Sequence, residues 1–162
     1  MAKESLIVRQ WANETVEELD QRTRAITLAV LRSVVYMSPV LSGRFRGNWQ
    51  VSVGFPIEAP IERLDKDGGT TLAVESGNVG GAGTVTFINN NVPYSEVIEY
   101  GQYPNPPKRG TWVKAAGKGK RRVPGHFEIN TIGGYSTQAP AGVVRVTMAR
   151  IQELIRESGK GS

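Results

Sequence analysis

The chain has no cysteine and a single histidine, and these two scarcities exclude much of the chemistry that small proteins perform at fixed sites. Without cysteine there is no disulfide, no thiolate metal ligand and no cysteine nucleophile, a composition that fits a reducing cytoplasm. The lone histidine, His126, has no second histidine or carboxylate cluster at the spacing of a metal site. We therefore expect no metal, no cofactor and no enzymatic activity.

Long hydrophobic runs are also lacking. No stretch approaches the roughly 18 apolar residues that a membrane-spanning helix needs, so we expect no membrane partner. The polar start at residues 1–5 is followed by no continuous apolar run, which argues against a signal peptide. A length of 162 residues with 39% hydrophobic residues predicts one domain, 1–162, and 19 Gly with 9 Pro predict many turns.

Helical spacing of apolar residues marks two long helices. The first is predicted from about Ser5 to Met37, stopped by Ser38-Pro39, and the second from about Ala141 to Glu157. We expect one buried face on each. The first face comprises Val16, Leu19, Ile26, Val30, Val34 and Met37, widened by Leu28, Leu31 and Val35, and the second comprises Val143, Val144, Met148, Ile151, Leu154 and Ile155. The broad apolar face near Met37 is interpreted as core, the alternative being cover by a neighbouring subunit.

The segment between these helices alternates between strand and turn signals. Residues 49–55 have an apolar side chain at every second position and predict a strand, and residues 70–75 and 84–89 predict two more, with Val85 and Phe87 inward. Pro93 suits the first turn of a short helix from Tyr94 to Tyr100 that Gly101 caps. The expected fold class is α+β, with a small, mainly antiparallel sheet packed by a long N-terminal helix and a C-terminal helix, and with a long basic loop.

Residues 102–137 are rich in glycine, proline and basic side chains and are predicted to be that long loop, with short strands near Trp112 and His126. A flexible tail is expected at residues 158–162. Seven basic residues and no acidic residue lie between Pro106 and Arg122, and removing them from the net charge of +5 leaves −2 for the rest of the chain. The basic excess is therefore confined to one arm.

That arm has three interpretations: a solvated loop, a contact with nucleic-acid phosphates in which an aromatic ring stacks on a base, or docking on an acidic protein surface. Arg44 and Arg46 are second candidates for a partner contact, the alternative being that they cap the helix end at Met37. The candidate contact residues of the arm are Lys108, Arg109, Trp112, Lys114, Lys118, Lys120, Arg121 and Arg122.

Two signatures and one upstream turn occur in a fixed order along the chain. The turn is Ser38 to Arg46, the first signature runs from Val92 to Gly101, and the second runs from Gln138 to Arg145 into the closing helix. In this order they resemble the tail-completion and neck proteins of long-tailed bacteriophages. The motif residues that carry the resemblance are Pro93, Tyr94, Glu99, Tyr100, Gly101, Pro140 and Gly142.

The resemblance implies a structural virion protein of the phage neck or tail end, assembled in the host cytoplasm. It implies a subunit that joins the tail to the head connector as a ring around the DNA passage, commonly of six copies. Its implied partners are further copies of itself, head-connector proteins and tail-tube or tail-terminator proteins. The basic arm at 106–122 is expected to reach either a neighbouring subunit or the genomic DNA.

Two other classes stay open from the sequence. One is a small nucleic-acid-binding module that uses the basic arm at 106–122. The other is a small metal-dependent nuclease that uses Glu99 or Glu128.

Overall fold

The computed structural model describes residues 2–103, 111–117 and 122–158. Five α-helices, one 3-10 helix and six short strands lie in these ranges, which confirms the predicted α+β class with its long N-terminal and C-terminal helices. In chain order they are α1 (Ala2–Met37), α2 (Arg44–Gly47), β1 (Trp49–Val53), α3 (Gly69–Glu75), η1 (Ser76–Asn78), β2 (Thr86–Asn90), α4 (Ser95–Tyr100), β3 (Thr111–Val113), β4 (His126–Glu128), β5 (Thr131–Ile132), β6 (Tyr135–Ser136) and α5 (Val144–Ser158).

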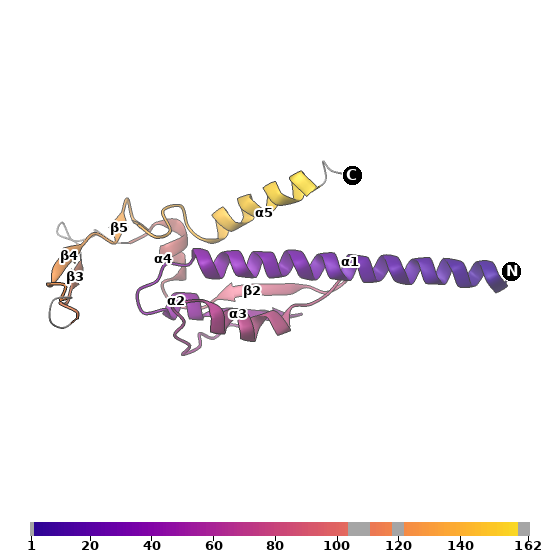
Figure 1. The fold of residues 1–162 in the computed structure, drawn as a ribbon, viewed down its shortest axis with the longest axis horizontal. Helices are drawn as coiled ribbons and strands as arrows, with labels where there is room; N and C mark the ends of the chain where they lie inside the picture. The colour runs from indigo at the N-terminus through magenta and orange to yellow at the C-terminus, as the bar shows by residue number, and fades with distance from the viewer. Residues whose placement is uncertain (1, 104–110, 118–121, 159–162) are drawn as a thin grey trace.

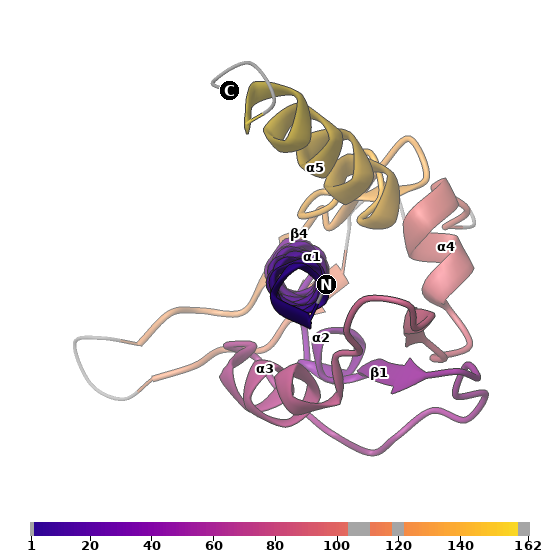
Figure 2. The ribbon, with the colours of Figure 1, turned by 90° about the vertical axis from the view of Figure 1, so that its right-hand side faces the viewer.

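Helix α1 is the axis of the molecule. In Figure 1 it spans most of the length, with α5 along one side and α3, β1 and β2 along the other. The view along α1 in Figure 2 places α5, α4 and the β1–α3 layer around its circumference. Strands β3 and β4 lie beyond the C-terminal end of α1, at the opposite extreme of the molecule from the N-terminus (Figure 1).

Only the C-terminal half of α1 enters the core. Leu31, Val34 and Val35 are buried, whereas Val16 and Leu19 are 61% and 56% exposed. The predicted buried face was therefore wrong for the N-terminal half of the helix. Helical periodicity locates an apolar face but not what covers it, and here every described side chain from residue 12 to residue 19 is exposed.

Phe45 and Trp49 form the centre of the core beneath α1. Their rings meet edge to face, 5.9 Å between centroids at 81°. Trp49 Nε1 donates to Ser38 Oγ at 2.7 Å, and Ser38 Oγ donates to the carbonyl of Val34 at 2.6 Å. Ser38 thus ends α1 and provides the indole with its hydrogen-bond partner inside the core.

The main sheet has two strands. β1 pairs with β2 antiparallel, from Trp49 opposite Asn90 to Val53 opposite Thr86. The predicted strand extended too far, because the pairing ends at Val53 and Phe55 is 84% exposed. The inward residue of β2 is also different from the prediction. Ile88, opposite Val51, packs against the core, while Val85 precedes the strand and is exposed, and Phe87 points to the other face of the sheet.

Residues 70–75 form most of helix α3, so the strand predicted there was wrong. The carboxylate of Asp65 accepts hydrogen bonds from the backbone N–H of Gly68 and Thr71, at 2.8 and 2.7 Å, and so caps the start of the helix. Thr71 and Glu75, one turn apart, are both buried and Ala73 between them is exposed, whereas in a strand all three side chains would share one face. The turn at residues 65–69 therefore leads into a helix.

Helix α5 lies on α1 through a narrower stripe than predicted. Val143, Thr147 and Ile151 are buried, and the hydroxyls of Thr147 and Ser33 lie 2.9 Å apart across the two helices. Val144, Met148 and Ile155 remain exposed. The helix ends at Ser158, so the first residue of the predicted flexible tail is helical; the other tail residues lie outside the described ranges.

The region predicted as a long loop contains two small ribbons. β3 pairs with β4, with Trp112 opposite Phe127, and β5 pairs with β6, with Thr131 opposite Ser136. The short strands expected near Trp112 and His126 are confirmed. None of the helices in the described part of the chain is long and apolar enough to cross a membrane.

Candidate functional site

The two sequence signatures meet at the start of α5. Glu99, in the last turn of α4, accepts hydrogen bonds from the backbone N–H of Val143, Val144 and Arg145 at 2.7, 2.8 and 3.0 Å. A carboxylate suits this position, because the first N–H groups of a helix have no partner within the helix and carry a partial positive charge. Burial alone would raise the pKa of Glu99, but the three N–H groups and the Arg145 guanidinium outweigh it, so the pKa lies below its usual value.

The side chain of Arg145 returns to α4. Its guanidinium donates to the carbonyl of Glu99 at 2.5 Å and to the hydroxyl of Tyr135 at 3.1 Å. It also lies over the rings of Tyr100 and Tyr135, 5.6 and 5.9 Å from their centroids. Two signature residues, Glu99 and Tyr100, therefore bind one cation from the other signature.

Two glycines permit this close approach. Gly142 has φ +81°, and a Cβ added there would lie 2.6 Å from the carbonyl oxygen of Glu99. Gly101 ends α4 in the left-handed region at φ +67°, as predicted for a C-terminal cap, and a Cβ there would enter the ring of Tyr135. Larger residues are excluded at both positions by backbone conformation and by space.

The upstream turn joins the same region. The side-chain amide of Gln138 accepts from the N–H of Val40 at 2.7 Å and donates to its carbonyl at 3.1 Å, as a neighbouring strand would. Tyr94 packs on Phe45, with centroids 6.3 Å apart. The Ser38–Arg46 turn is thus tied to both later signatures.

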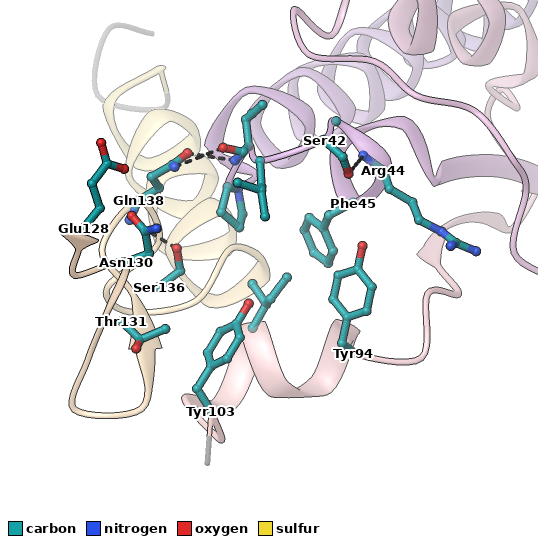
Figure 3. A pocket seen from close by; sticks show the side chains of 15 residues that line it. Ser42, Arg44, Phe45, Tyr94, Tyr103, Glu128, Asn130, Thr131, Ser136 and Gln138 are labelled. Atoms are coloured by element: carbon teal, nitrogen blue, oxygen red, sulfur yellow. Dashed lines mark hydrogen bonds between the residues drawn. The ribbon is translucent and has the colours of Figure 1, made fainter. Parts of the chain in front are cut away.

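A cavity of about 410 Å³ lies where the three segments converge (Figure 3). Figure 3 shows aromatic rings on one side and short polar side chains on the other. Burial raises the pKa of the Tyr94 and Tyr103 hydroxyls, so both stay neutral hydrogen-bond donors at neutral pH. The lining includes Phe45, Tyr94, Ile98, Tyr103, Asn130, Thr131, Ser136 and Gln138. Such a cavity can accommodate an apolar side chain that carries a polar tip.

The other two motif residues are prolines that flank this joint. Pro93 is exposed and precedes Tyr94, the residue before α4 begins. Pro140 is exposed and lies between Ala139 and Gly142 in a tight turn, closed by the hydrogen bond from Gly142 N to Ala139 O at 3.2 Å. Both fix φ next to a helix start and leave their own rings accessible.

Arg46 has a structural role that the sequence suggested as an alternative. Its guanidinium donates to the carbonyls of Tyr36 and Ser38, at 3.1 and 2.9 Å, and to that of Lys66 at 2.5 Å, and so caps the C-terminal end of α1. Arg44 forms an ion pair with Glu62 at 3.0 Å at the surface. The guanidinium of Arg46 is therefore occupied by contacts within the chain, whereas that of Arg44 remains accessible to a partner.

Three of the candidate arm residues are described. Trp112, Lys114 and Arg122 are exposed, and the ring of Trp112 packs on that of Phe127 with centroids 4.9 Å apart. The other five candidates lie outside the described ranges: Lys108, Arg109, Lys118, Lys120 and Arg121.

No group of three or more His, Asp or Glu side chains in the described ranges could hold a metal ion. His126 Nε2 and Glu128 Oε1 are 2.8 Å apart on the exposed ribbon. Hydrogen bonds to the carbonyl of Pro124 and to the carboxylate of Glu128 raise the pKa of the histidine. Both oxygens of Glu99, the other candidate for metal-dependent chemistry, already accept hydrogen bonds from α5.

Sequence reasoning missed Arg145 and Tyr135 as members of the joint. Arg145 stood at the end of the second signature, and Tyr135 follows a Gly-Gly turn that predicts a hairpin. Neither signal reveals that both side chains meet Glu99, because the contact joins segments far apart in the chain. Comparison with protein-family models, with curated proteins and with solved structures gives no match to this chain.

Proposed function

We propose that this protein is a structural virion subunit of a long-tailed bacteriophage, part of the neck or tail end, that joins the tail to the head connector as a ring around the DNA passage. Its partners are further copies of itself, head-connector proteins and tail-tube or tail-terminator proteins. It assembles in the host cytoplasm.

The observation that carries this proposal is the convergence of the three resemblance segments on one joint. Glu99 holds the start of α5, and Gln138 holds Val40 beside the cavity. Motif residues that bind one another favour a structural role for the motifs over a role in catalysis. In the same way, a carboxylate that is occupied by three backbone N–H groups is a poor ligand for the metal of a nuclease.

The shape gives further support. The N-terminal part of α1 and the β3–β4 ribbon project from opposite ends of the core, and both carry exposed apolar side chains. Exposed apolar clusters mark surfaces that other proteins cover. A subunit with contact surfaces at both ends is suited to assembly rather than to work as a monomer.

The deciding experiment is genetic. A phage that lacks this gene should produce filled heads and complete tails that remain unjoined, visible by electron microscopy of lysates, and a plasmid copy should restore joined particles. Infectious particles at the normal yield from the deletion would contradict the proposal. Light scattering of the purified chain should show a discrete closed oligomer.

A second candidate function, a small nucleic-acid-binding module, is favoured by one observation: Trp112, Lys114 and Arg122 are all exposed on the same arm. It predicts salt-sensitive DNA binding that weakens sharply when Lys118, Lys120, Arg121 and Arg122 are neutralised together. If this quadruple variant binds DNA as the parent does, the arm is not a DNA site.

A further inference from the structure

We propose that the β3–β4 ribbon of one copy docks on the N-terminal part of α1 of a second copy, so that subunits associate head to tail. This contact rests on the proposed function in one respect: the proposed ring makes a second copy of the chain the partner. Two surfaces are involved: the ribbon face, formed by Trp112, Lys114, Val123 and Phe127, and the helix end, formed by residues 12–20.

The ribbon face is apolar, one-sided and uncovered. The bridge between Ala116 and Val123 keeps the register of the Trp112–Phe127 pair, so that these side chains and Lys114 lie on one face. Trp112 and Phe127 are 53% and 52% exposed although their rings touch. A two-stranded ribbon is at best marginally stable alone in water, so cover on this face would stabilise it.

The helix end is the complementary surface. Val16 and Leu19 lie one turn apart on the same side of α1, and the neighbouring side chains of residues 12–19 are exposed. Asp20 marks the point where the body begins, because it accepts a hydrogen bond from the N–H of Ala82 at 2.8 Å. From Asp20 towards the N-terminus there is room for a ribbon to lie along the helix.

The charges of the two surfaces indicate that the partner is a second copy of this chain. Residues 12–20 carry four acidic side chains, of which Glu18 and Asp20 pair with Arg22 and Arg24, and no basic one. The described residues 111–117 and 122–127 of the arm carry Lys114 and Arg122 and no acidic side chain. Pairing two helix ends would bring acid against acid, and pairing two arms would bring cation against cation. Only the pairing of an arm with a helix end puts opposite charges together around the apolar contact.

The placement of the two surfaces gives the contact its symmetry. The ribbon lies beyond the C-terminal end of α1, whereas residues 12–20 lie in the projecting N-terminal half of that helix (Figure 1). The ribbon of one copy therefore cannot cover the helix of the same copy, and each copy offers one surface of each kind to its neighbours. Contacts between two different surfaces of identical subunits generate rings when the rotation closes. This is the type of interface that a ring around a passage requires.

Site-specific cross-linking tests the contact, because the natural chain has no cysteine. Leu19→Cys and Phe127→Cys are made in separate preparations, one with a tag that changes its mass, and are mixed with a short bismaleimide. We expect the mixed 19–127 species to dominate over both self-linked species. The matched control replaces Leu19→Cys by Leu64→Cys, another exposed leucine on the body, and should give little mixed product.

A second variant checks the charge argument. Glu17→Lys should lower the yield of the mixed species roughly two- to fivefold, and combining it with Lys114→Glu in the other preparation should restore the yield. Dominant 19–19 or 127–127 products, or no link above the Leu64→Cys control at high protein concentration, would overturn the contact. A closed oligomer without 19–127 links would contradict this interface but not the proposed ring. Infectious particles at the normal yield from the gene deletion would contradict the neck function, whatever the cross-links show.

Discussion

Glu99 and Arg145 bind each other through both main chain and side chain. The carboxylate of Glu99 accepts the backbone N–H of Arg145 at 3.0 Å, and the guanidinium of Arg145 donates to the backbone carbonyl of Glu99 at 2.5 Å. Each residue thus satisfies a free end of the other's helix: the N-terminal N–H groups of α5 and a C-terminal carbonyl of α4. Glu99 caps the start of α5, and Arg145 caps the end of α4. The stability of the joint between the two signatures should therefore depend on both residues.

The first prediction concerns removal of the cap. Glu99→Ala leaves three N–H groups at the start of α5 without their partner, so we expect the free energy of unfolding to fall by about 1–3 kcal/mol. Glu99→Gln keeps one acceptor oxygen and should cost less. Urea denaturation followed by circular dichroism measures both. Glu96→Ala, at an exposed position of the same helix, is the matched control, and an equal loss in that variant would refute the capping role.

The second prediction concerns pH. The pKa of Glu99 in the folded protein lies below its ordinary value of 4.5, so the native state binds this proton more weakly than the unfolded state. The contribution of Glu99 to stability is therefore complete above about pH 4.5 and is lost as the pH falls through the folded-state pKa. Asp65, whose pKa is also lowered by hydrogen bonds that outweigh its burial, acts in the same direction.

Denaturation midpoints measured between neutral pH and pH 3 should thus decline on acidification. The decline should be shallower in Glu99→Gln than in the parent, because the substituted side chain does not titrate. A parallel decline in both proteins would show that other carboxyls, not Glu99, carry the acid sensitivity.

The third prediction concerns space at the joint. Gly142→Ala places a methyl group 2.6 Å from the carbonyl of Glu99 at a φ of +81°, and we expect a loss of at least about 1 kcal/mol. Gly77→Ala is the control, since a Cβ there meets nothing within 4 Å and its φ is ordinary. The difference between the two thermal midpoints isolates the steric contribution, and equal midpoints would contradict it.

The sequence predicted elements better than it predicted what covers them. The C-terminal ends of α1 and α4 were predicted from Ser38-Pro39 and Gly101, which are local signals. The N-terminal ends differ slightly, at Ala2 rather than Ser5 and at Ser95 rather than Tyr94. The exposure of Val16 and Leu19 could not be predicted, because an apolar stripe has the same spacing whether the core or a second subunit covers it.

The errors share one physical origin, contacts between distant segments. Residues 70–75 contain β-branched side chains, which favour a strand. They form a helix because Asp65 caps its first N–H groups. Glu99 was selected as a motif residue, yet its partners on α5 lie far along the chain. Gln50 alternates with the apolar residues of β1 but is also buried, and its amide donates to the carbonyl of Ala59, nine residues along the chain, at 2.9 Å.

The fourth prediction concerns the ion pair behind β1. Arg63 Nη2 and Glu75 Oε1 are 2.9 Å apart with both side chains largely buried, and the second oxygen of Glu75 accepts the N–H of Val51 at 2.8 Å. Removing one member of such a pair leaves the other charged and without its counter-ion in the interior, so Glu75→Ala should destabilise the fold by about 3–5 kcal/mol. Glu18→Ala removes a shorter but exposed pair, the 2.6 Å contact with Arg22, and should cost no more than about 0.5 kcal/mol. Denaturant midpoints of the two variants, measured side by side, should therefore differ widely. Similar midpoints would mean that solvent reaches the Arg63–Glu75 pair, and that β1 is held to α3 by apolar contacts alone.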